Sequence, residues 1–399
     1  MMSMLLRLFV AAIVLTRAEP FQFPSIKFSF DNKTTETPKL ILSKDGAREL
    51  RDRTQAYCEG TDSVFHWCPD AEEGYQVASE VFERILSHQP NERSLVVSFP
   101  SANQGHLSKL ADVISSDKCK ELLGLSEVHV DLYPRAPAPL VRIQLRAGPG
   151  GGEMTRQQSK SWSRDKAREA TEDWVNNFLG RQRICPYTSS VTRAATGLSS
   201  VNVPVGHVRV RVDGEGLSSE VTRNARKLVS TFWSEVTFLL ESPQEEYATS
   251  LVVFPGYDDD FEKFVELCDD VVEQTVAATD STDFIGRAWF HPRYETDVVG
   301  HADVTAGHAI PHRQVEQFMS RLVESGDMVE SPLEYDVLAR ANDIVRRTPH
   351  ATINILRRVQ LNAAGEYEKG LGDKRPKANS IYVRNAVRVA KHFKSSEME

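Results

Sequence analysis

Three short landmarks recur in the same order in the two halves of this 399-residue chain. The first half contains Trp67-Cys68-Pro69, then residues 94–100 (Ser-Leu-Val-Val-Ser-Phe-Pro), then Leu132-Tyr133-Pro134-Arg135. The second contains Ile184-Cys185-Pro186, then residues 250–255 (Ser-Leu-Val-Val-Phe-Pro), then Phe290-His291-Pro292-Arg293. Ser94 and Tyr133 are 39 positions apart, and Ser250 and His291 are 41 apart. Landmarks that agree in order and spacing indicate a duplicated structural unit.

The sequence around each Ser-Leu-Val-Val predicts matching local structure. Apolar residues at helical spacing come before both copies, and another amphipathic stretch follows each. The first two stretches contain Tyr75, Ala78, Val81, Phe82, Ile85 and Leu86 in one copy and Val221, Ala225, Leu228, Val229, Phe232, Val236 and Leu240 in the other. We therefore predict an α/β fold, with α+β as the alternative. It consists of two related helix-strand-helix-strand modules, whose small sheets are covered by amphipathic helices.

Length and composition limit the class of protein. A chain of 399 residues is too long for one ordinary core and fits two domains. Its 40% hydrophobic and 26% charged residues are typical of globular proteins. The net charge of −8 gives no electrostatic reason to expect a nucleic-acid partner, since phosphate binding needs a basic surface. Nothing in the sequence indicates the oligomeric state.

The N-terminus has the pattern of a targeting segment. Arg7 precedes an apolar run over residues 8–15, and small residues near Ala18 fit a signal-peptidase site. We predict a signal peptide over residues 1–18, an unstructured leader over 19–45 and no transmembrane helix in the mature chain. The expected destination is the secretory and endomembrane system, or a plastid reached through it, because Phe21 is similar to an aromatic plastid-targeting signal.

Four further segments complete the predicted organisation. Residues 46–146 form a degenerate first copy, 147–164 a glycine-rich linker, 165–360 the second copy, and 361–399 a basic C-terminal helix and tail. The glycine-rich linker is not followed by Gly-Lys-Ser or Gly-Lys-Thr, so it does not predict a phosphate-binding loop.

Five cysteines at irregular spacing do not predict a disulfide scaffold. Cys58 and Cys68 are close enough in sequence to pair in an oxidising compartment, and the sequence leaves this open. Cys268 lies on an apolar helix stripe and is expected to pack in the core. Cys185 follows a helix built on Trp174, and Pro186 ends that helix, so the thiol is either structural or a nucleophile at the start of a loop.

Polar side chains gather after the predicted strand that ends at Phe290. His291, Arg293 and Tyr294 come directly after this strand, and the ends of strands are where sites are often built. A histidine there is either a hydrogen-bonded structural residue or a catalytic group. His308 and His312 would share a helix face, but no neighbouring carboxylate motif accompanies them, and we predict no metal site.

Four ordered motifs together resemble the domain of unknown function 1415 family. They are Cys185-Pro186-Tyr187 with Trp174 before it, residues 249–255, residues 290–294 and residues 347–357. The family shows Cys-Pro-Phe, Phe-His-Pro-x-Tyr and Arg-Ser-Pro-Tyr-Pro-x-Leu-His-Leu-Leu-Arg in that order. The resemblance covers residues 171–360 and implies that Cys185, His291, Tyr294, Arg347 and Arg357 are site residues. Residues 135–146 of the first copy also look like the last motif.

This chain departs from the family pattern at three positions. Tyr187 stands where the family has Phe, Ala351 where it has Pro, and Asn354 where it has His. If that histidine were indispensable, the chain would be inactive unless His350 replaced it. In the first copy Tyr133 occupies the position of His291, so we expect that copy to be a structural partner without a second site.

Two classes of function follow, and the resemblance does not choose between them. In the first, the protein is a hydrolase- or transferase-like enzyme with Cys185, His291 and Tyr294 as catalytic residues. Its small anionic substrate would contact residues from the last motif, namely Arg347, His350, Asn354 and Arg357. In the second, the protein is a non-catalytic binding or assembly factor. The sequence indicates no particular cofactor.

Overall fold

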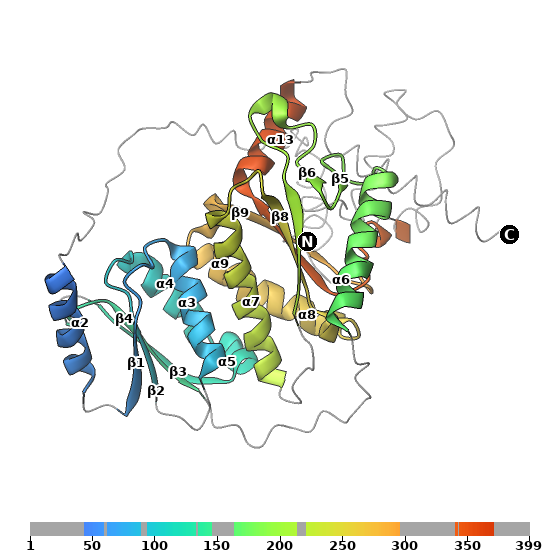
Figure 1. Ribbon diagram of the computed structural model, residues 1–399. Coiled ribbons are helices and arrows are strands. Elements are labelled where there is room, and N and C mark those ends of the chain that lie inside the picture. The colour runs from blue at the N-terminus through green and yellow to red at the C-terminus, as the bar shows by residue number, and fades with distance from the viewer. Residues whose placement is uncertain are drawn as a thin grey trace, which may run out of the picture. The chain divides into compact units, whose positions relative to one another are not determined.

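Two four-stranded sheets with the same strand order form the framework of the protein (Figure 1). The computed structural model describes residues 44–59, 62–88, 94–132, 135–145, 163–213, 221–295, 340–341 and 343–370. The predicted signal peptide, the leader up to residue 43, nearly all of the linker, Tyr133, His308, His312 and the predicted basic helix lie outside these residues. Within the described part, no helix is both long and apolar enough to cross a membrane.

The first sheet is built from residues 63–145. The elements in chain order are α2 (Lys44–Cys58), β1 (Ser63–Trp67), α3 (Gly74–Ser87), β2 (Ser94–Ser98), α4 (Gln104–Ser115), α5 (Asp117–Leu123), β3 (Leu125–Asp131) and β4 (Leu140–Leu145). The strand order is β1-β2-β4-β3. β1 runs parallel to β2, whereas β4 is antiparallel to both of its neighbours.

The second sheet follows the same plan. Before it come α6 (Arg164–Asp173), the π-helix η1 (Trp174–Arg181), β5 (Thr188–Ser190), β6 (Arg193–Ala194) and the short η2 (Ser199–Val201). The sheet is built from β7 (His207–Val212), α7 (Val221–Glu241), β8 (Tyr247–Val253), η3 (Pro255–Tyr257), α8 (Phe261–Leu267), the π-helix η4 (Cys268–Glu273), α9 (Gln274–Ala278), η5 (Ser281–Asp283), β9 (Ile285–Phe290), β10 (Thr352–Arg357) and α13 (Arg358–Gly370).

The strand order of the second sheet, β7-β8-β10-β9, repeats that of the first position by position. β7 is parallel to β8, and β10 is antiparallel to β8 and β9. The α/β fold and the helix-strand-helix-strand order are therefore confirmed. β4 and β10 are equivalent strands, since each is the third strand of its sheet. A gene duplication as the origin of this shared topology stays a prediction.

One part of the proposed repeat is wrong. Cys68-Pro69 follows β1 directly, whereas Cys185-Pro186 follows η1 and comes before β7, so the two dipeptides are not equivalent. Proline ends helices and strands alike, which made the two places look the same in the sequence. The predicted strand that ends at Phe290 begins at Ile285, and Phe284 before it is 39% exposed.

The inner faces of both sheets share one hydrophobic core. α3 buries Val77, Ala78, Val81, Phe82 and Ile85 completely, as its apolar stripe predicts. α3 packs along α7, whose buried apolar residues belong to the same cluster. This helix pair therefore joins the two copies through their apolar stripes, which explains why each copy has a stripe at the same place.

Polar contacts and one close backbone approach reinforce this junction. Arg226 of α7 donates to the carbonyl oxygens of Leu123 (2.6 Å) and Gly124 (3.2 Å), which end α5 in the other copy. Gly124 takes a left-handed conformation (φ 63°), which exposes carbonyl groups that need a donor. Gly74, at the start of α3, lies so close to the end of α9 that a Cβ atom would be 2.2 Å from the Thr279 carbonyl oxygen.

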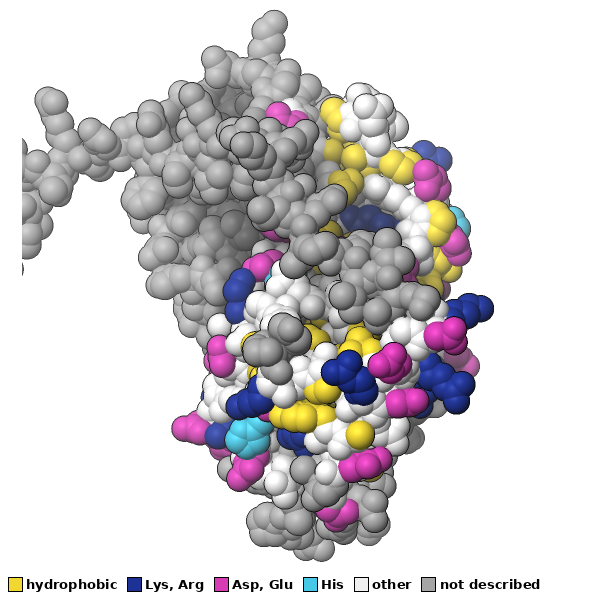
Figure 2. Space-filling view, turned by 90° about the vertical axis from the view of Figure 1, so that its left-hand side faces the viewer, with side chains coloured by type: hydrophobic (Ala, Val, Ile, Leu, Met, Phe, Trp, Pro, Cys, Tyr) yellow, Lys and Arg dark blue, Asp and Glu magenta, His cyan; other side chains and the backbone are white. Residues whose placement is uncertain are grey.

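The other face of the first sheet, its outer face, carries α2. Buried residues of this layer are Cys58, Val96, Ala136 and Leu140. Asp131 and Arg142 form an ion pair of 3.0 Å there, and Arg135 adds a second one to Asp131. Figure 2 shows the side of the molecule that lies at the left of Figure 1, where side chains of both charges surround hydrophobic ones.

All five cysteines are free thiols in the structure, and four of them are buried. Cys58 and Cys68 are therefore not bonded to each other. Burial raises the pKa of the Cys68 thiol to about 12, and the nearby Glu80 carboxylate adds to this shift. Cys268 packs in the shared core, as predicted. Cys185 is the one cysteine that is half-buried.

The close approach at Gly74 predicts a strong effect of one methyl group. Gly74→Ala places a Cβ against the backbone of the other copy, so overpacking should lower the free energy of unfolding by about 1–3 kcal/mol. Gly365→Ala is the control, because no atom lies within 4 Å of its Cβ, and alanine in a helix should stabilise by about 0.4–1 kcal/mol. Urea unfolding measures both, and equal stability of G74A and wild type contradicts the packing described for α3.

Candidate functional site

His291 is completely buried just beyond β9. Its Nε2 lies 2.8 Å from the Tyr257 carbonyl oxygen, and its Nδ1 lies 3.0 Å from the Arg293 amide nitrogen. A carbonyl only accepts and an amide only donates, so the ring is neutral with its proton on Nε2. The ring also stacks on Phe261, with 4.7 Å between the ring centroids. Both nitrogens are thus engaged by backbone groups, which favours a structural role over that of a general base.

Tyr294 and the arginines before β10 form a second layer at this end of the sheet. The Tyr294 hydroxyl, which is buried, accepts a 2.8 Å hydrogen bond from Nη1 of Arg346. The Arg346 guanidinium also lies 5.1 Å from the centre of the Tyr294 ring. Arg347 is exposed and donates from Nε to the Tyr294 carbonyl oxygen at 3.3 Å. Tyr294 and Arg347 therefore lie together, as the motifs predicted. Their contacts hold the segment that follows β9 against the segment that precedes β10.

His350 lies at the same end of the sheet and is bound by a carboxylate. Its Nδ1 is 2.7 Å from Oδ2 of Asp258, whose Oδ1 accepts from the Ala351 amide at 2.8 Å. Both partners are largely buried, with 4% and 12% of their side chains exposed. Asp258 therefore fixes the start of β10 beside the end of β8. Asp258 and Arg346 were not predicted as site residues, since neither stands in a motif that identifies it.

Arg357 lies at the other end of β10. It is five positions away from Thr352, which corresponds to about 17 Å along a strand. Its guanidinium donates to the carbonyl oxygens of Ser242 (2.7 Å) and Tyr247 (3.1 Å), which connect α7 to β8. Burial lowers the pKa of Arg357, which nevertheless stays charged at neutral pH because arginine starts so high. The structure thus separates Arg357 from His291, and one substrate does not reach both.

Asn354 lies on the outer face of the second sheet. Its pairing with Leu251 and Ala288 places it on the face opposite to Ile353 and Ile355, which belong to the shared core. The side chain is partly exposed, and its Oδ1 lies 2.9 Å from the Thr249 hydroxyl. The predicted site residues are therefore distributed over three places, namely the carboxyl end of β8 and β9, the opposite end of β10, and the outer face.

Cys185 packs on the layer that covers part of the outer face. Its amide donates to the Leu179 carbonyl at 3.2 Å, and Arg183 between them takes a left-handed conformation (φ 54°) that turns the chain back after η1. The thiol packs against a cluster that includes Leu179 and Leu251.

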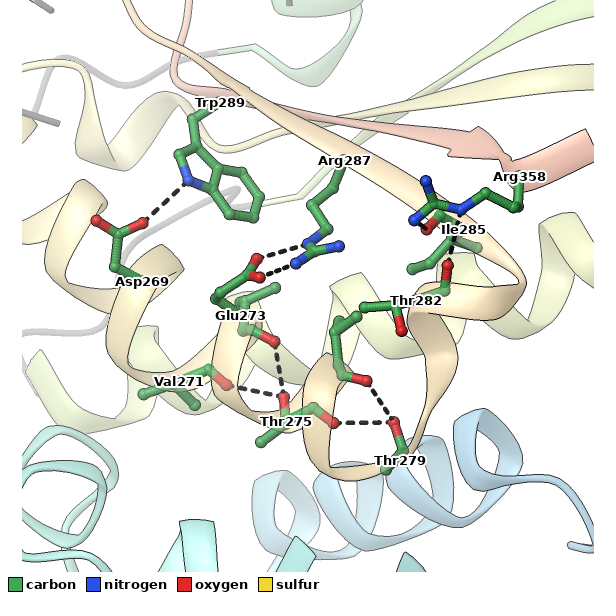
Figure 3. Close-up of polar contacts among 12 residues, drawn as sticks. Asp269, Val271, Glu273, Thr275, Thr279, Thr282, Ile285, Arg287, Trp289 and Arg358 are labelled. Atoms are coloured by element: carbon green, nitrogen blue, oxygen red, sulfur yellow. Dashed lines mark hydrogen bonds and ion pairs between the residues drawn. The ribbon is translucent and has the colours of Figure 1, made fainter. Parts of the chain in front are cut away.

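Strand β9 is held by the two π-helices, one on each face. On the inner face, Glu273 of η4 receives two hydrogen bonds from Arg287, and Asp269 accepts from the Trp289 indole at 3.2 Å (Figure 3). On the outer face, the Trp174 ring of η1 meets the Phe290 ring edge-on, with centroids 5.6 Å apart. π-Helices are rare and often occur at functional sites. The residues around β9 are therefore positioned more tightly than helix packing alone requires.

The indole Nε1 of Trp174 is buried and has no hydrogen-bond partner among the described residues. It shares this property with several other buried polar atoms, among them the Trp233 indole nitrogen in the shared core. The ring also stacks on Phe178, with centroids 6.0 Å apart and an angle of 25° between the planes. A buried donor without an acceptor costs about 1–3 kcal/mol, so such a group calls for an explanation. Trp174 was part of the family resemblance, but its indole nitrogen was not recognised as a site atom.

The described residues contain no group of three or more His, Cys, Asp or Glu side chains that could hold a metal ion. The Trp174 indole and the Asn354 amide, both on the outer-face side of the second sheet, are uncharged. Such groups orient an organic molecule and contribute little to catalysis by themselves.

The buried His291 predicts a loss of stability in acid. Burial lowers its pKa, so the unfolded chain binds the proton more readily than the folded protein does. Its contribution to stability should be complete above about pH 6.5 and decline as the pH falls below that value. Urea unfolding at pH 7.5 and 5.5 measures this, and the decline should be smaller in His291→Gln. An equal decline in both proteins contradicts the assignment of a neutral, buried imidazole.

Comparison with known proteins supports the resemblance found in the sequence. No curated protein and no solved structure matches this chain. Residues 166–306 match the family described as protein of unknown function (DUF1415). This segment includes η1, Cys185, the strands β7–β9 and His291, and it lies in the second copy. The second copy is therefore similar to the DUF1415 family over residues 166–306, a range that ends before the last motif at residues 347–357.

Proposed function

We propose that this protein is a non-catalytic binding protein, and that its ligand lies on the outer face of the second sheet beside Trp174. The observation that carries this proposal is the buried indole N–H without an acceptor among the described residues. A ligand oxygen or nitrogen that accepts this hydrogen bond removes the cost of the unpaired donor. That gain is available only in the bound state, so it contributes directly to affinity.

The surroundings of Trp174 suit a small organic ligand. Phe178 and Phe290 contact the Trp174 ring from two elements, so an acceptor that reaches the indole N–H would lie in aromatic surroundings. Asn354 supplies a second polar group on the same face of the sheet as Phe290. It is two positions along β10 from Thr352, the residue that pairs with Phe290. A few polar groups within an apolar lining are typical of small-molecule sites.

The catalytic alternative has less support. A mechanism with Cys185 as nucleophile, His291 as base and Arg357 as anion binder needs the three side chains around one substrate. His291 uses both ring nitrogens for backbone contacts, and Arg357 binds two carbonyl oxygens at the other end of β10. The loss of the family histidine at Asn354 is also more consistent with binding than with proton transfer.

A location in the secretory and endomembrane system, or in a plastid reached through it, belongs to the same proposal. It rests on the apolar run at residues 8–15 and the small residues that follow it.

Trp174→Phe tests the binding proposal, because it keeps an aromatic ring and removes the N–H. The smaller ring leaves a cavity beside Phe178 and Phe290, so the free energy of unfolding should fall by about 1 kcal/mol, less the cost of the unpaired donor that the variant removes. Binding of benzamide, measured by ligand-detected NMR, should weaken about 5- to 100-fold, which corresponds to about 1–3 kcal/mol.

Trp67→Phe in β1 is the matched control and should bind benzamide as wild type does. A purely structural role of Trp174 predicts that W174F binds benzamide as tightly as wild type. That result would sink the proposal.

The proposed location is tested by N-terminal sequencing of the protein purified from its native cells. Cleavage after Ala18, or a few residues later, is expected. A mature protein that begins at Met1 or Met2, together with a cytosolic fluorescent fusion, contradicts it.

A further inference from the structure

We infer that the basic C-terminal segment of this chain, residues 380–391, docks on an exposed apolar patch at the start of α13. The patch consists of Phe284, Val359 and Tyr75, and we call it the Phe284 patch. The inference does not depend on the proposed binding function, since it concerns neither Trp174 nor the outer face of the second sheet.

Exposed large hydrophobic side chains are few in the part of the chain that the structure describes, and two of the three lie on neighbouring segments. Tyr57 is one, and Phe284 and Val359 are the others. The Arg358 amide, directly before Val359, donates to the Phe284 carbonyl oxygen at 2.8 Å. Val359 is 53% exposed, and the Phe284 ring meets the half-buried Tyr75 ring edge-on, with centroids 5.7 Å apart. Exposed apolar residues that gather at one place favour a docking surface more than scattered ones do.

The start of α13 fixes the patch in place. The Arg358 guanidinium donates to the carbonyl oxygens of Thr282 (2.7 Å) and Ile285 (3.1 Å), which lie on either side of Phe284 in the chain (Figure 3). The segment that carries Phe284 is therefore bound to the helix that carries Val359. A surface that is already formed binds a partner without the entropic cost of ordering itself first.

Carboxylates surround the patch. Asp283 comes directly before Phe284 and is exposed. Glu73 and Glu241 are exposed beside Tyr75. Burial raises the pKa of the Tyr75 hydroxyl, and both carboxylates add to this shift. An apolar patch with this acidic rim complements a partner that carries positive charges next to apolar residues.

The chain itself contains a segment with this composition. The spacing of residues 380–391, which lie outside the described residues, predicts an amphipathic helix with Arg384, Arg388 and Lys391 on one side. Its apolar residues are Ile381, Val383, Val387 and Val389. In the docked state the apolar side chains cover the Phe284 patch, and the basic ones face the carboxylates of the rim.

The C-terminal segment is also close enough in the chain to reach the patch. α13 ends at Gly370, eleven positions after Val359, which corresponds to about 16 Å along a helix. The connecting residues 371–379 span up to about 30 Å when extended, so the chain can turn back along α13. Docking within one chain has the effective concentration of a short tether, so a patch of modest size is sufficient.

Hydrogen–deuterium exchange of the full chain tests the inference. Amides of residues 380–391 should exchange at least about tenfold more slowly in wild type than in Val359→Lys, because the lysine removes apolar surface and repels the basic segment. Tyr57→Lys is the matched control, since it places the same charge at the other exposed large hydrophobic residue, on α2, and it should exchange as wild type does. Circular dichroism checks that both variants are folded.

Equal exchange of residues 380–391 in wild type and a folded V359K protein overturns the inference, whether the segment is protected in both or in neither. Protection that grows with protein concentration, together with a dimer in size-exclusion chromatography, assigns the patch to the C-terminal segment of a second copy and also overturns docking within one chain.

Salt supplies a test that needs no variant. Sodium chloride at about 0.5 M screens the charges of the rim, so exchange of residues 380–391 in wild type should become several-fold faster. Exchange that does not respond to salt overturns the inference, and this measurement decides the matter if V359K does not fold.

Discussion

The structure depends on the packing of α3 against α7. Each sheet has an apolar inner face that its own helices cover, and the helices of the two copies then cover each other. The resulting core is continuous from the first sheet to the second, and neither copy completes it alone. Arg226 and Gly74 show how closely the copies fit, one through hydrogen bonds to helix-end carbonyls and the other through a contact that leaves no space for a methyl group. Tightly fitted interiors of this kind transmit small changes in volume as large changes in stability.

This arrangement leaves the outer faces for other uses. In the first copy the outer face is closed by α2 and by the ion pair between Asp131 and Arg142. In the second, α6 and η1 cover the β7 and β8 side, and Trp174 reaches β9 through Phe290. The two copies share their topology and differ in the side chains they place on it. The difference in function that we propose follows from those side chains, since a common fold does not imply a common function.

The residues of the family motifs acquire a different meaning in three dimensions. His291, Tyr294 and Arg347 hold the chain where it leaves β9, and His350 with Asp258 holds it where it returns into β10. Arg357 closes the connection between α7 and β8. Residues of this kind persist because the backbone carbonyls and amides at strand ends need partners when they are buried. A motif of polar residues therefore marks a fixed backbone here at least as well as it marks a reaction centre.

The sequence by itself determined the amphipathic helices, the buried strands and their repeated order, because apolar spacing reports directly which face of an element is buried. Its motifs also revealed a resemblance of residues 171–360 to the DUF1415 family, which the family match supports over residues 166–306. It did not determine which polar residues meet, since β9 and β10 bring together positions some sixty residues apart by a register that no local pattern encodes. Only the tertiary structure separated Arg357 from His291 and paired His350 with Asp258. Only it placed Asn354 and Trp174 on one face, because the face of a strand residue depends on its pairing partners and on which layer covers them.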